Sequence, residues 1–120
     1  MNSYKELAVW EKSIELAKEI YVLTGYFPKS ELFGITNQMR RASISISSNI
    51  AEGHTRYHKQ EYAQFLRIAF ASGAELETQL IISKSLDFCP KEKYKKSEML
   101  LSEIMKMLNR LIFVVKNQIS

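Results

Sequence analysis

Two histidines, His54 and His58, stand four residues apart and are the first candidates for chemistry in this chain. Histidines at this spacing can bind one metal ion together when both lie on one face of a helix. Here residues 54–57 are predicted to connect two helices, and no cysteine, aspartate or third histidine lies at ligand spacing. The pair therefore predicts neither a metal site nor a metal cofactor.

Carboxylates and serines give no stronger catalytic pattern. Glu75 and Glu77 point to different faces of a helix, and the chain lacks the Glu-x-x-His motif that builds di-iron sites in helical bundles. The serine-rich run at residues 43–48 suggests a nucleophile, but neither histidine is predicted to lie in the same helix. Small residues that let a neighbouring helix approach closely are the commoner reason for such a run. With no glycine-rich phosphate loop either, the sequence predicts a protein that is not an enzyme, with no cofactor and no small-molecule substrate.

Basic residues are the remaining candidates for a function. The chain has 17 Lys and Arg against 13 Asp and Glu, a formal net charge of +4, which suits an anionic partner such as RNA or DNA. The candidates for phosphate contacts lie in or beside the second, third and fourth predicted helices: Arg40, Arg41, Arg56, Lys59, Lys106 and Arg110. Arg40 and Arg41 project about 100° apart on a helix, so either can instead pair with a carboxylate such as Glu52 or Glu75. Structural and binding roles for these two arginines both stay open.

Long helices must position these residues, because four glycines and two prolines in 120 residues leave little room for loops or strands. A chain of this length, 46% hydrophobic, has enough residues for one core but not for two. Heptad-like apolar stripes predict helices at about residues 4–26, 30–53, 58–86 and 90–118. Short connections force neighbouring helices to be antiparallel. We therefore expect an all-α, up-down-up-down four-helix bundle that forms a single domain over residues 1–120.

Local signals mark the ends and crossings of these helices. Pro28, Ser30 and Glu31 are typical of the start of the second helix, with Ser30 as a capping residue. Gly53 is expected to end that helix in the left-handed conformation. Gly73, in the middle of the third helix, predicts a close helix crossing, since glycine otherwise weakens a helix.

Polar residues of the second helix are predicted to form a structural network of Gln38, Asn49 and Glu52. A buried carboxylate without a partner is too costly to retain. We therefore expect Asn49 and Glu52 to be substantially buried and hydrogen-bonded at the end of the helix, with an arginine or a backbone N–H as partner.

Apolar residues on more than one face of the first three helices predict self-association. In the first helix one stripe is expected to form the seam of the bundle, and a second lies on an adjacent face: Leu7, Trp10, Ile14, Ala17, Tyr21 and Thr24 in the seam, and Val9, Leu16, Ile20, Leu23 and Phe27 beside it. Exposed stripes of this extent usually mark an interface. The fourth helix instead places basic and apolar residues on its outer side: Lys95, Met99, Lys106, Arg110 and Phe113.

Cellular context follows from three observations. The N-terminal residues mix charge with apolar side chains and lack the apolar core of a signal peptide. No apolar run approaches the roughly 20 residues that span a membrane, so no membrane partner is expected. The single cysteine, Cys89, cannot form an internal disulfide, which fits a reducing cytoplasm and a packing role.

The chain resembles the four-helix-bundle family of 23S rRNA-intervening-sequence proteins over nearly its whole length. The resemblance is carried by motifs in a specific order: Phe33-Gly34, Gln38, Arg40-Arg41, Ser45-Ile46, Asn49-Ile50-Ala51-Glu52-Gly53 and Ala74-Glu75-Leu76-Glu77-Thr78-Gln79-Leu80. It implies a homopentamer of antiparallel bundles and a fold similar to that of the accessory protein of diversity-generating retroelements. Members are often encoded in insertions within rRNA genes or elsewhere in bacterial genomes, and their biochemical role is largely unassigned.

Two functions of different classes stay open at this stage. One is an oligomeric, non-enzymatic scaffold that associates with RNA or DNA through its basic surface. The other is a purely structural or protein-interaction oligomer whose basic residues only keep it solvated. Neither an RNA-recognition motif nor a helix-turn-helix signature is present, so sequence-specific reading of bases is not expected.

Overall fold

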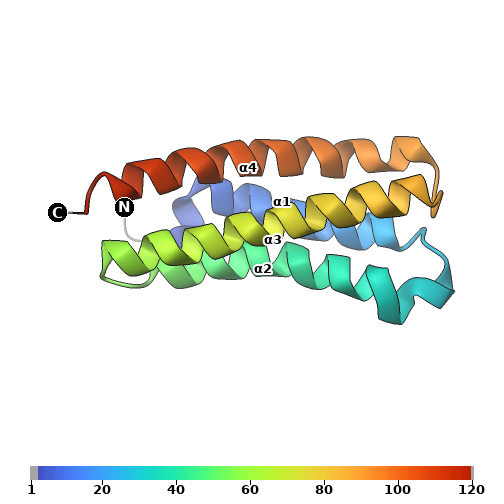
Figure 1. Cartoon of the computed structure of the whole chain (residues 1–120), viewed down its shortest axis with the longest axis horizontal. Coiled ribbons are helices and arrows are strands. Elements are labelled where there is room, and N and C mark those ends of the chain that lie inside the picture. The colour runs from blue at the N-terminus through green and yellow to red at the C-terminus, as the bar shows by residue number, and fades with distance from the viewer. Residues whose placement is uncertain (1–2, 120) are drawn as a thin grey trace.

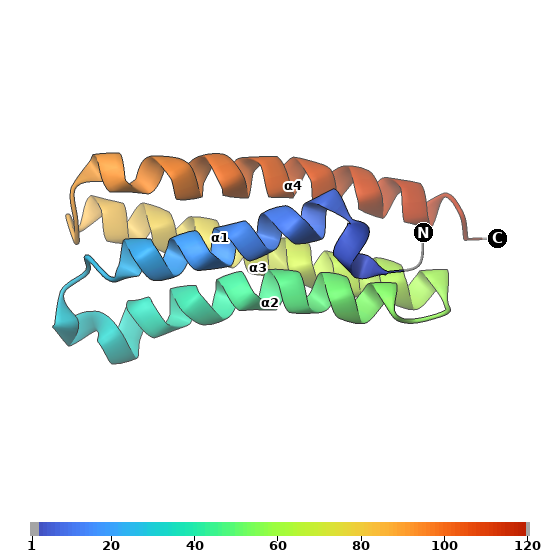
Figure 2. The ribbon, with the colours of Figure 1, turned by 180° about the vertical axis from the view of Figure 1, so that it is seen from behind.

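The computed structural model describes residues 3–119, which form four α-helices and no strand (Figure 1). The helices are α1 (Ala8–Thr24), α2 (Asn37–His54), α3 (Lys59–Ser85) and α4 (Lys95–Lys116). Each helix runs antiparallel to the one before it, and α4 packs back against α1, so that α2 and α4 lie diagonally across the bundle (Figures 1 and 2). The predicted all-α, up-down-up-down four-helix bundle is confirmed.

The face of α1 that enters the core is the second of the two predicted stripes. Leu16, Ile20 and Leu23 are at most 1% exposed, whereas Tyr21 of the expected seam is 46% exposed and Trp10 is only half-buried. The prediction placed the seam about a quarter-turn away from its true position. Ser13, which belonged to neither predicted stripe, is fully buried on this face, because its hydroxyl donates to the carbonyl of Trp10 in its own helix. Thr24 is the residue of the expected seam that is buried.

The segment before α2 is broken, although the sequence predicted one helix from residue 30. A 3-10 turn (Lys29–Glu31) leads into a π-type turn (Leu32–Thr36), and Gly34 there has φ −112° and ψ −118°. These angles lie outside the main regions open to residues with a Cβ, so glycine permits the break. Ser30 is not a capping residue, because it lies inside the 3-10 turn, whose N-cap is Pro28. The break leaves Phe33 92% exposed.

Gly53 does not end α2 in the left-handed conformation, which corrects the prediction. It lies inside the helix, which continues to His54, and no described glycine has a positive φ. A Cβ at this position would lie 2.7 Å from the Cβ of Phe65 in α3. The glycine therefore lets α2 and α3 approach each other closely. Gly73 serves α3 and α4 in the same way, as predicted, because a Cβ there would collide with the thioether of Met105.

The end of the bundle that joins α3 to α4 is closed by aromatic side chains. Pro90 precedes a 3-10 turn (Lys91–Tyr94), so α4 begins at Lys95 and not at the proline. Tyr94 is fully buried beside Phe27 and donates its hydroxyl hydrogen bond to Ser83 at 3.0 Å. Burial raises the pKa of Tyr94 to about 12. Cys89 is 8% exposed nearby, which agrees with the packing role predicted for it.

Candidate nucleic-acid interface

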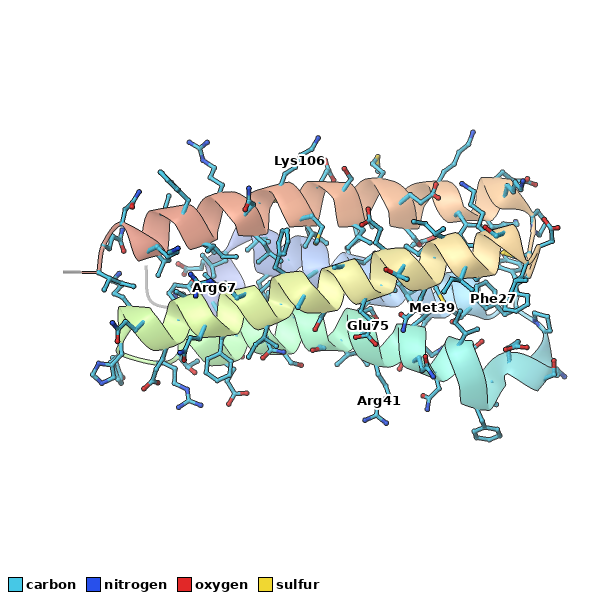
Figure 3. All side chains as sticks on the ribbon, in the orientation of Figure 1. Phe27, Met39, Arg41, Arg67, Glu75 and Lys106 are labelled. Atoms are coloured by element: carbon cyan, nitrogen blue, oxygen red, sulfur yellow. The ribbon has the colours of Figure 1, made fainter. Side chains whose placement is uncertain are left out.

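The outer face of α4 is a basic surface, which we call the α4 face and define by Lys95, Lys106, Arg110 and Lys116. All four side chains are exposed, as are the interleaved Met99 and Phe113. Figure 3 shows Lys106 pointing away from the bundle. The predicted outer side of the fourth helix is therefore confirmed. From Lys95 to Lys116 the face extends about 31 Å at 1.5 Å per residue.

Both acidic side chains of α4 form ion pairs with lysines of other helices. Glu98 pairs with Lys84 of α3 at 2.8 Å, and Glu103 pairs with Lys12 of α1 at 3.4 Å. Among residues 3–119, none of the four cations of the α4 face forms an ion pair. These four side chains are therefore accessible to an anion.

Arg40 is a structural residue of the α1–α2 contact. Its Nε donates to Oγ1 of Thr24 at 2.9 Å, and its guanidinium carbon lies 4.6 Å from the ring centre of Tyr21. Thr24 in turn donates to the carbonyl of Ile20 at 2.7 Å. The Arg40 side chain is half-buried and held by two contacts, and it does not belong to the α4 face.

Arg41 lies on the opposite side of the bundle from Lys106 (Figure 3). It is exposed, and with Gln38, Ser45 and Glu75 it lines a groove of about 320 Å³ between α2 and α3. No ion pair within the described part of the chain joins Arg41 to Glu75 or Glu52. The structure thus separates the two neighbouring arginines into one engaged and one solvated residue.

Arg56 and Lys59 lie together at the turn between α2 and α3, but only Lys59 has a free charge. Arg56 pairs with Glu52 at 3.3 Å and with Glu61 at 3.6 Å, and its guanidinium carbon lies 5.0 Å from the ring centre of Phe65. Lys59 is exposed at the first position of α3, beside a polar hollow of about 560 Å³. Arg56 is therefore a weaker candidate for phosphate contacts than its sequence suggested.

The predicted polar network of Gln38, Asn49 and Glu52 does not form within the described residues. Glu52 is exposed, and its partner is the surface residue Arg56, so the expectation that this carboxylate is buried is wrong for the single chain. The reason is that Glu52 lies on the outward side of α2, one turn after Ser48, which is also exposed. Asn49 is half-buried and donates to the carbonyl and hydroxyl of Ser45, and Ser45 bonds Ser72 of α3.

His54 closes α2 and therefore shares a helix with the serine-rich run, contrary to the prediction. Its ring packs edge-on against Tyr62 at 5.5 Å between ring centres, and no hydrogen bond in the described chain joins it to a serine. Within residues 3–119 no three His, Cys, Asp or Glu side chains are grouped to hold a metal ion. The same residues contain no helix that is both long and apolar enough to span a membrane.

The six predicted phosphate-contact residues therefore lie in separate places. Lys106 and Arg110 share the α4 face, Arg56 and Lys59 lie at the α2–α3 turn, and the two arginines of α2 lie on different sides of that helix. Sequence reasoning noted Lys95 but missed Lys116, whose signal was its position three residues after Phe113 on the same side of the helix. The cross-helix ion pairs had no signal in the sequence.

A family model and a solved structure are both similar to this chain over most of its length. The model of the family described as 23S rRNA-intervening sequence protein matches residues 5–110. A crystal structure from Bacteroides thetaiotaomicron VPI-5482, described as a protein with unknown function from the S23 ribosomal protein family, is 26% identical in sequence. Its TM-score is 0.81, over 88% of this chain and 98% of the other. No curated protein matches the chain.

Proposed function

Because the chain belongs to the 23S rRNA-intervening sequence protein family, we propose that it is a non-enzymatic, oligomeric scaffold that binds RNA or DNA through phosphate contacts. The observation that supports this proposal is the α4 face, where basic side chains are exposed and unpaired while the acidic residues of the same helix are held by α1 and α3. A nucleic acid that contacts these cations releases condensed counterions, which favours binding without reading the bases.

Self-association through the side of α1 and α2 is the second part of the proposal. Tyr21 is 46% and Ile44 42% exposed, and Trp10 and Ile14 of the same side of α1 are half-buried. Large apolar side chains left exposed on one side of a single chain can mark a protein interface. A ring of five subunits is the arrangement that the family resemblance implies, and symmetry would repeat the α4 face in every subunit.

A protein-interaction oligomer without nucleic acid is the alternative function. The exposed Phe33 favours it, because a large aromatic side chain that is 92% exposed at a backbone break is a typical anchor for a partner protein. In that function the α4 face would serve only solubility. The two functions differ in whether anionic polymers bind, so one binding experiment separates them.

Binding to labelled rRNA fragments, single-stranded DNA and duplex DNA should be measured by fluorescence anisotropy over a series of salt concentrations. We expect affinity that falls steeply with salt and varies little with sequence. The double variant Lys106→Gln/Arg110→Gln removes two phosphate contacts, so the salt slope for duplex DNA should decrease by about 1.8 for each subunit in contact. Light scattering should show an unchanged oligomer.

The matched control is Lys18→Gln/Arg67→Gln, which removes the same charge from exposed positions on α1 and α3 that form no ion pair within residues 3–119. This control should keep most of the wild-type affinity and slope. An equal loss in both double variants would show that only net charge matters and would reject the α4 face. No binding of wild-type protein at low salt would reject the scaffold function in favour of the protein-interaction oligomer.

A further inference from the structure

We propose that the pocket at the connection between α1 and α2 is a binding site for one small oxyanion, the head group of a phosphate or a carboxylate. The pocket has a volume of about 240 Å³. Its walls combine cationic, hydroxyl and apolar side chains with one glycine: Thr24, Gly25, Phe27, Pro28, Lys29, Leu32, Thr36 and Arg40. None of these residues belongs to the α4 face, so the site is independent of the nucleic-acid interface proposed above.

Arg40 supplies a pre-oriented guanidinium group. The bond from its Nε to Thr24 and the stacking on Tyr21 fix the plane of the group before any ligand arrives. Its two Nη groups form no ion pair with a carboxylate anywhere in residues 3–119. The charged end of Arg40 is therefore available to an anion. The free edge of the guanidinium matches the paired oxygens of a carboxylate or phosphate.

Thr36 supplies a second, independent observation. Thr36 lines the pocket and is only 2% exposed, and its hydroxyl oxygen is buried with no hydrogen-bond partner in the described part of the chain. A threonine in a regular helix donates to a carbonyl three or four residues earlier, but the break at Gly34 disrupts that turn. A buried hydroxyl without a partner is unfavourable. Rotation about its Cα–Cβ bond would allow it to donate to an oxygen of a bound anion.

Charge and size define the class of ligand. Lys29 and Arg40 give the pocket two cations, and no carboxylate lies in its walls. The nearby acid, Glu31, lies against Gly34 and forms no ion pair with either cation in the described chain. The apolar walls of Phe27, Pro28 and Leu32 limit the space. At about 240 Å³ the pocket is smaller than the roughly 300–1,000 Å³ that holds drug-sized ligands, so it fits a head group and not a nucleotide.

Isothermal titration calorimetry with inorganic phosphate and, separately, with acetate tests the proposal at constant ionic strength. Wild-type protein should bind at least one of the two saturably at one site per chain, and the same anion should raise the melting temperature. The relative affinities of the two probes distinguish a phosphate site from a carboxylate site. Failure of both probes to saturate at tens of millimolar would overturn the proposal.

Three variants separate binding from folding. Arg40→Lys keeps the charge but loses the fixed fork of donors, so we expect affinity to fall about tenfold or more. Arg41→Gln, the neighbouring residue outside the pocket, should bind like wild type. Thr36→Val removes the unpaired hydroxyl, so it should weaken anion binding severalfold without lowering the melting temperature of the free protein.

Thr36→Val decides the question if Arg40→Lys fails to fold. Unchanged affinity in Thr36→Val, or an equal loss in Arg41→Gln and Arg40→Lys, would reject the site. These results do not depend on the α4 face, because neither Lys106 nor Arg110 is altered.

Discussion

Two glycines inside helices, Gly53 and Gly73, should respond in opposite ways to substitution by alanine. Both lie where two helices come close together, but their neighbours differ. A Cβ at Gly53 would lie 2.7 Å from the Cβ of Phe65 and 3.1 Å from Cδ1 of Tyr62. A Cβ at Gly73 would instead meet the thioether of Met105, the far end of an unbranched and flexible side chain.

The free energies follow from these contacts. The Cβ of Phe65 is fixed to its backbone, so Gly53→Ala must push α2 and α3 apart, an overpacking cost of about 1–3 kcal/mol. Alanine recovers at most about 1 kcal/mol in helix propensity, and less near a helix end. The net loss should be about 1–2 kcal/mol. In Gly73→Ala, Met105 can change rotamer, so the propensity gain offsets the cost and unfolding free energy should stay unchanged or rise by up to about 1 kcal/mol.

Urea unfolding followed by far-ultraviolet circular dichroism measures this contrast. The two variants should differ by about 2 kcal/mol, or about 8 °C in melting temperature for a chain of this size. Subunit concentration must be equal in all samples, because association contributes to apparent stability. A Gly53→Ala protein as stable as wild type, or a Gly73→Ala protein that loses more stability than Gly53→Ala, would refute the packing argument.

Three further predictions concern polar residues. Arg40→Ala should lower the unfolding free energy by about 1–2 kcal/mol, because it removes a hydrogen bond and the stacking on an aromatic ring. Arg41→Ala should change the unfolding free energy by less than about 0.5 kcal/mol. Urea titration of both variants measures the difference, and equal effects would contradict the prediction. Since burial raises the pKa of Tyr94 from its ordinary value near 10 to about 12, the folded state holds this proton more tightly, and its contribution to stability is full below about pH 10 and lost as the pH rises towards 12. Tyr94→Phe should therefore flatten the alkaline fall in stability, and a melting temperature with the same slope above pH 10 in both proteins would refute this. Glu52→Ala should lower the melting temperature only slightly, because an exposed ion pair with Arg56 contributes at most about 1 kcal/mol; a large drop in a thermal scan would show that the carboxylate is buried in the assembled protein.

The helices and the outer face of α4 could be predicted because they depend on periodicity along one segment. Leu100, Leu101, Ile104 and Leu108 recur at helical spacing and are all buried. The polar residues between them must then face outwards. This prediction needs no knowledge of the neighbouring helices.

The features that the sequence did not predict depend on a second segment. Gly53 has the same local signal whether it ends a helix or admits a neighbour, and only the position of Phe65 in α3 distinguishes the two. The bond from Arg40 to Thr24 likewise joins residues of different helices. The candidate nucleic-acid interface could not be predicted in full for the same reason, because the charge of Arg56 is compensated by Glu61 across the turn between two helices.

The diagonal positions of α2 and α4 connect the two parts of the proposed function. Arg41 of α2 and Lys106 of α4 point to opposite sides of the bundle (Figure 3). Subunits that associate through the side of α1 and α2 would therefore carry the α4 face on the outside of the assembly. If the subunits instead associated through the α4 face, unpaired cations of neighbouring subunits would come close together. At separations below the Debye length of about 8 Å they would repel each other. With the basic faces outside, several weak phosphate contacts from different subunits can engage one strand, and their combined affinity far exceeds that of a single subunit.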